Sequence, residues 1–129
     1  MSKKIYSFFL LFMIISNNTY SKKLEYSGSC KFQGYMDRLI TCLDKELENY
    51  DKELNLLYKK EFDRFRNNRL KNTELIWIKF READCEYIAY EVNEGLQFPI
   101  IYKICMINKT KIRIADLKRS VFYIDWISK

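Results

Sequence analysis

Apolar side chains recur at steps of three to five residues between positions 35 and 68, and lysine, glutamate and aspartate fill most of the positions between them. This spacing places the apolar residues on one face of an α-helix, so the segment is predicted to form one long amphipathic helix. The residues of that face are Leu39, Leu43, Leu47, Tyr50, Leu54, Leu57, Phe62 and Phe65. Such a face must be buried against another element, which indicates a helical bundle.

A second helix is predicted over residues 72–93. The polar run 67–69 interrupts the first pattern. Asn72 or Thr73 is placed to cap the next helix, and Glu74 would then lie near the positive end of its dipole. The apolar residues of this helix are Leu75, Ile76, Trp77, Ile78, Phe80, Ile88, Ala89 and Val92.

Gly95 and Pro99 mark the next connection, because glycine commonly ends helices and proline is tolerated in the first turn of a new one. A third helix is predicted over residues 99–118. The tail 121–127 is too apolar to be left in solvent, so we expect it to dock as a short helix or an extended arm. The fold class is therefore all-α, a small antiparallel three-helix bundle with a docked C-terminal tail.

The N-terminal segment 1–21 has the layout of a cleavable signal peptide. Two lysines precede the apolar run 5–15, and a polar stretch follows it. The run is too short to span a bilayer comfortably, and we expect cleavage after Ser21. The exported protein is then one helical domain of residues 22–129, in the periplasm or outside the cell. Removal of the signal takes away two lysines and no acidic residue, which reduces the formal charge from +6 to +4.

Cys30 follows three small residues, a pattern that superficially resembles the site of a lipid-modified cysteine. Lys22, Lys23 and Glu25 separate it from the apolar run, where such a site requires hydrocarbon. No other segment is long and apolar enough to cross a membrane. We therefore expect no stable membrane anchor after signal cleavage, and we assign Cys30 to a disulfide.

The four cysteines all follow the predicted signal, so they are expected to oxidise and form two disulfides. Cys85 and Cys105 lie ten residues before and ten residues after Gly95. They fall at the same height if the second and third helices form an antiparallel hairpin. This favours Cys85 with Cys105, which leaves Cys30 with Cys42. The pairing of Cys30 with Cys105 and of Cys42 with Cys85 stays open, since four cysteines allow three connectivities.

The chain contains no histidine, which removes the usual general base and the commonest nitrogen ligand of a metal. No two cysteines have the spacing of a zinc knuckle, and no nucleotide loop or nucleophile motif is present. We therefore expect no metal, no cofactor and no enzymatic activity. The alternative is a small carboxylate-dependent envelope hydrolase, with the candidate residues Asp51, Glu61, Asp63, Asp84 and Glu86.

Nucleic acid is not expected as a partner, although the chain carries a net charge of +6. The charges alternate in sign along the first helix instead of clustering. The most basic stretch is interpreted as the solvated face of the third helix. Its residues are Lys103, Lys109, Lys111, Arg113, Lys118 and Arg119.

Two motifs and the order of the cysteines resemble a known family. The motifs are Asp-x-x-Leu-Asn-x-x-Tyr at 51–58 and Trp-x-x-x-Arg-x-x-x-Cys at 77–85. Together with Cys30, Cys42, Cys105, Thr110, Arg113 and Leu117, they resemble the LprI-like lysozyme-inhibitor domain family, named for a mycobacterial lipoprotein. The resemblance covers most of the chain between Cys30 and Leu117.

The resemblance implies an exported, disulfide-bonded helical protein that inhibits lysozyme. The expected partner is therefore a protein, either lysozyme or another component of the cell envelope. The alternative is a structural or interaction protein that shares the scaffold without inhibiting lysozyme. The positions that match the family motifs are Asp51, Asn55, Tyr58, Trp77 and Arg81.

Trp77, Arg81 and Cys85 follow at four-residue steps and project from one stripe of the second helix. We expect this stripe to face the first helix, where Arg81 binds a carboxylate or a backbone oxygen and Trp77 covers it. The interpretation that we favour is that these residues brace the bundle.

Long-range charge opposes the inhibitor interpretation, because lysozymes of the animal type are strongly basic and the exported chain carries +4. A local acidic patch on the first helix would offset that repulsion. We predict this patch at Asp44, Glu46, Glu48, Asp51 and Glu53.

Overall fold

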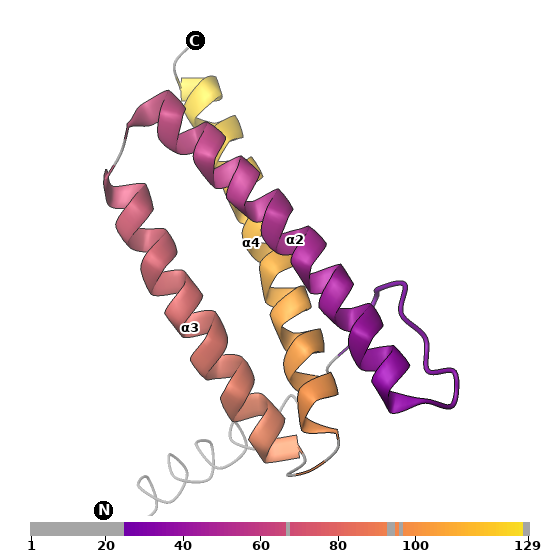
Figure 1. Cartoon of the computed structure of the whole chain (residues 1–129). Helices are drawn as coiled ribbons and strands as arrows, with labels where there is room; N and C mark the ends of the chain where they lie inside the picture. The colour runs from indigo at the N-terminus through magenta and orange to yellow at the C-terminus, as the bar shows by residue number, and fades with distance from the viewer. Residues whose placement is uncertain (1–24, 67, 93–94, 96, 128–129) are drawn as a thin grey trace, which may run out of the picture.

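The computed structural model of the protein describes residues 25–66, 68–92, 95 and 97–127. These residues form three α-helices and no strand: α2 (Met36–Phe65), α3 (Asn68–Val92) and α4 (Phe98–Ile127). Figure 1 shows the chain running along α2, back along α3 and forward again along α4. The predicted all-α, antiparallel three-helix fold is confirmed. The predicted signal peptide lies outside the described residues, and its cleavage stays a prediction.

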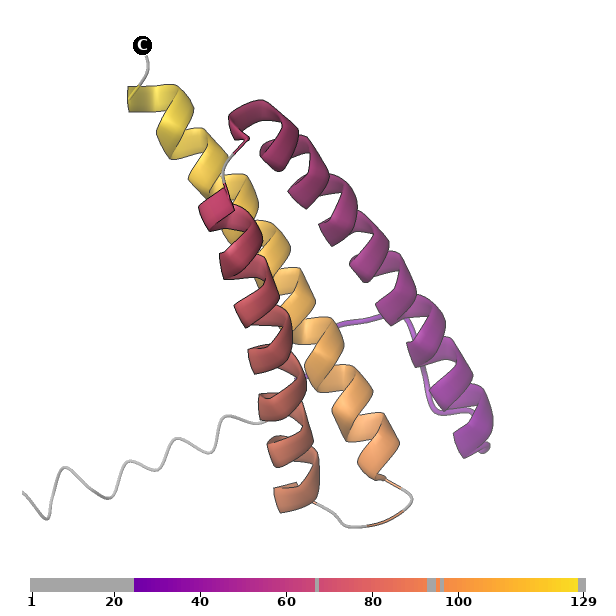
Figure 2. The same ribbon diagram turned by 60° about the vertical axis from the view of Figure 1, so that its left-hand side comes forward.

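α4 is the central helix of the bundle. Both α2 and α3 pack along α4, and they make little contact with each other. The turned view in Figure 2 shows the same arrangement, with α4 between its two neighbours. Each buried apolar cluster contains residues of α4: Ile107 with Cys30 and Leu43, Ile114 and Leu117 with Leu54, and Cys105 and Met106 with Cys85.

Both disulfides form in the pairs that the sequence favours. Cys85 of α3 is bonded to Cys105 of α4, with Cα atoms 5.5 Å apart. Cys30 is bonded to Cys42 of α2, with Cα atoms 5.8 Å apart. Cys30 thus forms the disulfide to which the sequence analysis assigned it. None of the described helices is long and apolar enough to cross a membrane.

The start of α3 differs from the expectation. α3 begins at Asn68, so Asn72 and Thr73 lie inside the helix and neither caps it. The hydroxyl of Thr73 instead donates to the carbonyl oxygen of Arg69, 2.8 Å away. α2 ends because Arg66 adopts a left-handed conformation with φ of 44°, which leaves a very short connection to α3.

The predicted separate tail is wrong, because residues 121–127 continue α4 to Ile127. The segment between Lys118 and Ile127 contains neither glycine nor proline. Nothing in the local sequence therefore interrupts the backbone hydrogen bonds of the helix.

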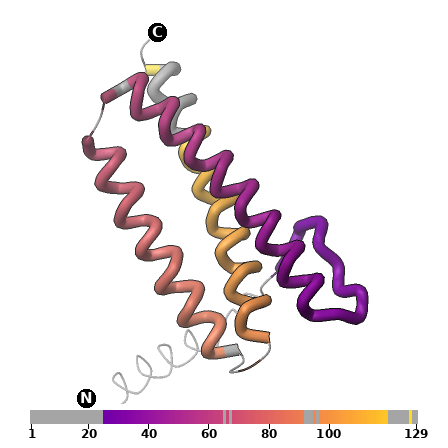
Figure 3. The backbone as a smooth tube through the Cα atoms, viewed as in Figure 1, coloured from indigo at the N-terminus to yellow at the C-terminus, as the bar shows by residue number. Residues whose placement is uncertain are grey.

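Residues 25–35 form an extended N-terminal arm that precedes α2. Figure 3 shows this arm looping beside the first turns of α2. Gly34 has φ of 86°, a conformation that side chains disfavour, so the arm turns there into α2. The arm is the one described segment outside the helices long enough to present a surface of its own.

Candidate protein-binding site

Charged residues of the two motifs form a network where the three helices meet. Arg81 of α3 is 6% exposed, and its Nη1 donates to Asp51 Oδ1 of α2 at 2.6 Å. The same nitrogen donates to Thr110 Oγ1 of α4 at 2.7 Å. The hydroxyl of Thr110 in turn donates to the carbonyl oxygen of Met106. One guanidinium therefore links all three helices.

Trp77 lies between two guanidinium groups. The carbon at the centre of the Arg81 guanidinium lies 5.0 Å from the ring centroid, and that of Arg113 lies 5.7 Å from it. Arg113 also donates twice to Glu74 Oε2, from Nε at 3.0 Å and from Nη2 at 2.8 Å. The expectation that Arg81 binds a carboxylate under Trp77 agrees with this geometry. Trp77, Arg81 and Cys85 were expected to face α2. Trp77 and Arg81 contact α2 and α4, and Cys85 is bonded to α4.

The remaining motif residues, Asn55 and Tyr58, lie outside this network. Asn55 is exposed on α2. Tyr58 is half-buried and stacks on Phe62, with ring centroids 6.0 Å apart. The structure therefore brings together Asp51, Trp77 and Arg81, which brace the bundle and offer little surface to a partner.

The five residues of the predicted acidic patch do not gather on one face. At about 100° per residue, Asp44, Glu48 and Asp51 lie on one side of α2, and Glu46 and Glu53 lie on the other. Each carboxylate also has a partner within the chain. The partners are Lys103 for Asp44, Tyr26 for Glu46, Lys52 for Glu48, Arg81 for Asp51 and Lys118 for Glu53. These acids therefore mainly neutralise neighbouring cations.

The basic stretch of α4 is likewise engaged, and it is not a free solvated face. Lys103 and Lys118 pair with acids of α2, while Lys109 and Arg113 pair with Asp84 and Glu74 of α3. The remaining contacts are Lys111 with Ser27 and the ring of Tyr50, and Arg119 with Asp116. α4 thus holds its neighbours by charge as well as by apolar contact.

The N-terminal arm is anchored to the bundle at several points. The Tyr26 hydroxyl donates to Glu46 of α2 and accepts from the backbone N–H of Cys30 at 3.0 Å. Asn108 of α4 donates to the carbonyl oxygen of Glu25 at 2.8 Å. Gly28 lies so close to the Tyr26 ring that an added Cβ would be 2.2 Å from it. Together with the Cys30–Cys42 bond, these contacts hold the arm in one conformation.

Beyond its anchors the arm presents large apolar side chains to solvent. Phe32 is 61% exposed and Tyr35 is 60% exposed, and Met36 at the start of α2 lies beside them in the sequence. Sequence analysis did not single these residues out. Their position in the sequence could have identified them, because these aromatic residues lie in a short segment that a disulfide ties to a helix.

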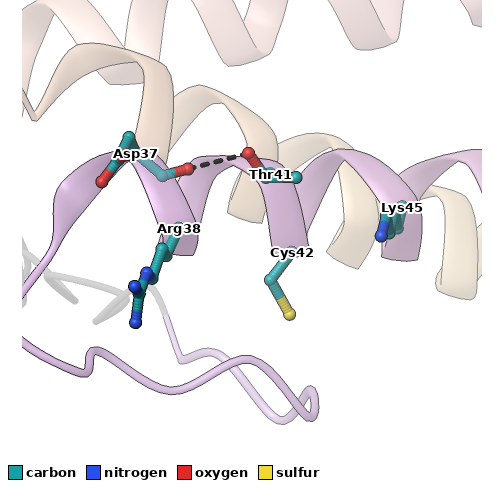
Figure 4. A pocket seen from close by; sticks show the side chains of 5 residues that line it. All are labelled: Asp37, Arg38, Thr41, Cys42 and Lys45. Atoms are coloured by element: carbon teal, nitrogen blue, oxygen red, sulfur yellow. Dashed lines mark hydrogen bonds between the residues drawn. The ribbon is translucent and has the colours of Figure 1, made fainter.

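A hollow of about 330 Å³ lies along the first turns of α2, next to the arm. Its walls are Asp37, Arg38, Thr41, Cys42 and Lys45. Figure 4 shows Arg38 and Cys42 extending from α2 toward the arm, and Thr41 bonded to the carbonyl of Asp37. The guanidinium of Arg38 lies 4.8 Å from the ring centroid of Tyr35. This open hollow, with three charged side chains in its walls, suits contact with another protein better than enclosure of a small molecule.

The Tyr26 anchor is expected to respond to alkaline pH. Burial and the hydrogen bond to Glu46 raise the pKa of Tyr26 from its ordinary value of 10 to about 12. A raised folded-state pKa means that this anchor contributes fully below pH 10 and is lost as pH rises through about 12. An NMR titration of isotope-labelled tyrosines should show one resonance titrating near that value. Its persistence in Tyr26→Phe would assign the shift to another tyrosine.

Chemistry other than binding has little support in this geometry. No group of three or more metal-ligating side chains occurs in the part of the chain that the structure describes. Of the candidate catalytic carboxylates, Asp51 and Asp84 are held in ion pairs with Arg81 and Lys109. Glu61 is buried in α2, and Asp63 and Glu86 are exposed. None of the five lines the hollow beside the arm.

Comparison with known protein families matches residues 31–117 to the family described as Lysozyme inhibitor LprI. The match extends from the arm, through α2 and the disulfide-bonded pair α3 and α4, to Leu117 in α4. No curated protein and no solved structure matches the chain. Since the match spans most of the sequence, the chain belongs to the LprI family of lysozyme inhibitors.

Proposed function

We propose that the protein is exported to the periplasm or beyond, where it binds a lysozyme and inhibits it. The observation that supports this most directly is the family match over residues 31–117. Two disulfides and the absence of free cysteines among the described residues suit an oxidising compartment. The inhibitor acts by contact and not by chemistry, because its charged side chains are mostly engaged in holding the helices together.

We propose further that the N-terminal arm makes the contact. Aromatic residues and arginine supply most of the binding energy at protein interfaces. The arm offers Phe32 and Tyr35, each more than half exposed, with Arg38 beside Tyr35. Because the arm is fixed by a disulfide and by hydrogen bonds, little conformational entropy is lost when a partner binds it.

The charge near the arm suits the cleft of a lysozyme better than its outer surface. A lysozyme cleft holds two carboxyl groups, which hydrolyse the sugar polymer. Lys31, Arg38 and Lys45 lie on the arm and on the adjoining turns of α2, and the structure gives none of them an acidic partner among the described residues. Local attraction between these cations and the cleft carboxylates offsets the long-range repulsion between two basic proteins.

Replacement of both Phe32 and Tyr35 by serine is expected to weaken inhibition about thirtyfold, because loss of central aromatic contacts costs about 2 kcal/mol or more. The measurement is lysis of a cell-wall suspension by a purified animal-type lysozyme, with increasing amounts of oxidised protein. Leu56→Ser is the matched control, since Leu56 is also exposed but lies on α2 away from the arm. Both variants should keep the helical circular dichroism signal of the parent.

The same assay distinguishes contact through the arm from contact through the acidic residues of α2. Glu48→Lys reverses a charge that contacts only Lys52 one turn along the same helix, and so leaves the arm intact. Glu46→Lys is less informative, because it also removes the bond to Tyr26 of the arm. Weaker inhibition by Glu48→Lys together with full inhibition by the Phe32 and Tyr35 variant would move the contact to α2. Lack of inhibition by the parent protein would contradict the proposed function itself, and release of sugar fragments by the protein alone would identify a hydrolase.

A further inference from the structure

The outer face of α3 carries a stripe of exposed residues that the described part of the chain leaves mostly uncovered. Two contacts with α4 occur at its border: Lys109 Nζ lies 5.0 Å from the ring centroid of Phe80, and the ring centroid of Phe98 lies 4.9 Å from that of Tyr90. Ile76, Phe80, Ala83, Tyr87 and Tyr90 follow at steps of four, three, four and three residues. The four large side chains are each more than half exposed, and Ala83 is exposed too. These steps are those of a coiled-coil seam, in which one helix packs along another. We call these five residues the α3 stripe.

The α3 stripe lies opposite the side of α3 that packs on α4. At about 100° per residue, its mean direction is roughly 160° from that of Arg81 and Cys85, which are buried. Figure 1 shows α3 at the edge of the bundle, with the arm on the far side of α2. α3 is therefore apolar on two opposite sides, and α4 covers one of them.

The charges that flank the α3 stripe complement those of a second copy in antiparallel orientation. Lys79 and Glu86 are seven residues apart, so they lie on the same flank of the stripe. When Ala83 faces its own copy, residues at equal distances on either side of it face one another. Lys79 is four residues before Ala83 and Glu86 is three residues after it, so Lys79 of each helix lies within one residue of level with Glu86 of the other. Two-fold symmetry forms this pair twice. Neither residue has an ion pair to another described residue within the chain.

A parallel arrangement lacks this complementarity. Flanking residues five positions apart would then face one another, which places Glu86 beside Glu91 of the other copy. Lys79 would face Asp84, which already pairs with Lys109 of α4. From these observations we propose that two copies of the protein associate through antiparallel packing of their α3 stripes, with Ala83 at the centre.

The size of the α3 stripe sets the strength of this association. An aromatic side chain buries about 150–250 Å² when fully covered, so four large side chains that are already partly covered contribute roughly 400 Å² per copy. A standard stable interface buries about 800 Å² on each partner. The dimer is therefore a weak one that forms with increasing concentration. It leaves both N-terminal arms uncovered, and it does not depend on lysozyme as the partner.

Sedimentation equilibrium of the oxidised protein tests the proposal, over concentrations from about 1 µM to about 1 mM. The expected result is a reversible monomer–dimer equilibrium. Tyr87→Glu places a charge in the seam and should raise the dissociation constant at least tenfold. Lys79→Glu and Glu86→Lys should each weaken the dimer by a few-fold, and the double variant should restore it. Leu56→Glu is the control, because Leu56 is equally exposed on α2 and should leave the equilibrium unchanged.

A protein that stays monomeric throughout this range would overturn the proposal. A dimer that Tyr87→Glu leaves intact would also overturn it, since the contact would then lie elsewhere. Failure of the charge exchange to restore association would overturn the antiparallel arrangement. All of these positions are exposed, so the circular dichroism spectrum and melting temperature of each variant should match those of the parent and exclude unfolding as a cause.

Discussion

Replacement of Asp51 by alanine is expected to lower the free energy of unfolding by about 3–5 kcal/mol, because it leaves a buried guanidinium without its opposite charge. Arg81 is 6% exposed, and its Nε already has no hydrogen-bond partner among the described residues. After the change, Arg81 keeps its contact with the Trp77 ring and one hydrogen bond, to the Thr110 hydroxyl, which itself donates to the carbonyl of Met106. Asp51 itself is 37% exposed, so the cost arises mainly from Arg81.

Urea unfolding followed by circular dichroism measures this loss, and a second substitution tests its cause. Arg81→Met keeps much of the side-chain volume under Trp77 but removes the charge. The protein with both Asp51→Ala and Arg81→Met should therefore be more stable than the one with Asp51→Ala alone. Asn55→Ala is the matched control, since it alters an exposed motif residue one turn along α2 and should cost less than about 0.5 kcal/mol. Equal losses at Asp51 and Asn55 would be inconsistent with a bracing role for the network.

Removal of the Cys85–Cys105 disulfide, by alanine at both positions, is expected to lower stability by about 3–5 kcal/mol. The cross-link closes a loop between residues 20 apart, which restricts the unfolded chain by about 3 kcal/mol. Both cysteines are also buried between α3 and α4, so their replacement leaves a small cavity in that contact. Thermal unfolding of the variant and the parent gives the difference.

The Cys30–Cys42 disulfide provides the comparison, because it ties the arm to α2 instead of joining two helices. Alanine at both positions should cost about 2–3 kcal/mol and leave the helical signal intact at room temperature. Inhibition of lysozyme should nevertheless fall, since the arm is then free to move. If the Cys85–Cys105 variant lost inhibition while remaining folded and the Cys30–Cys42 variant kept it, the arm would not be the contact surface.

The sequence predicts the helices and the disulfides because both depend on spacing along the chain. The period of Leu39, Leu43 and Leu47 identifies α2, and the equal distances of Cys85 and Cys105 from Gly95 identify their pairing. Spacing along the chain does not predict the ends of the helices equally well. Thr73 has the residue type of a cap, but its hydroxyl bonds to the helix carbonyl of Arg69 equally well.

Spacing along the chain could not predict which charged and aromatic side chains remain free on the surface. Asp44, Glu46 and Glu48 are close in sequence, yet they lie on different sides of α2 and reach different partners. Which side of α2 faces α4 depends on packing between helices, and that packing decides which charges remain free. The exposed aromatics Phe32 and Tyr35 are likewise apparent only when the rest of the arm is seen to be anchored.

The position of α4 also bears on the order in which the fold can form. α4 is the last helix to be synthesised, and α2 and α3 make little contact without it. Stable tertiary structure therefore requires the thirty residues of α4, because each of the other two helices packs mainly against it. For the export proposed above, this order of helices delays folding until α4 has been made, which favours passage of an unfolded chain.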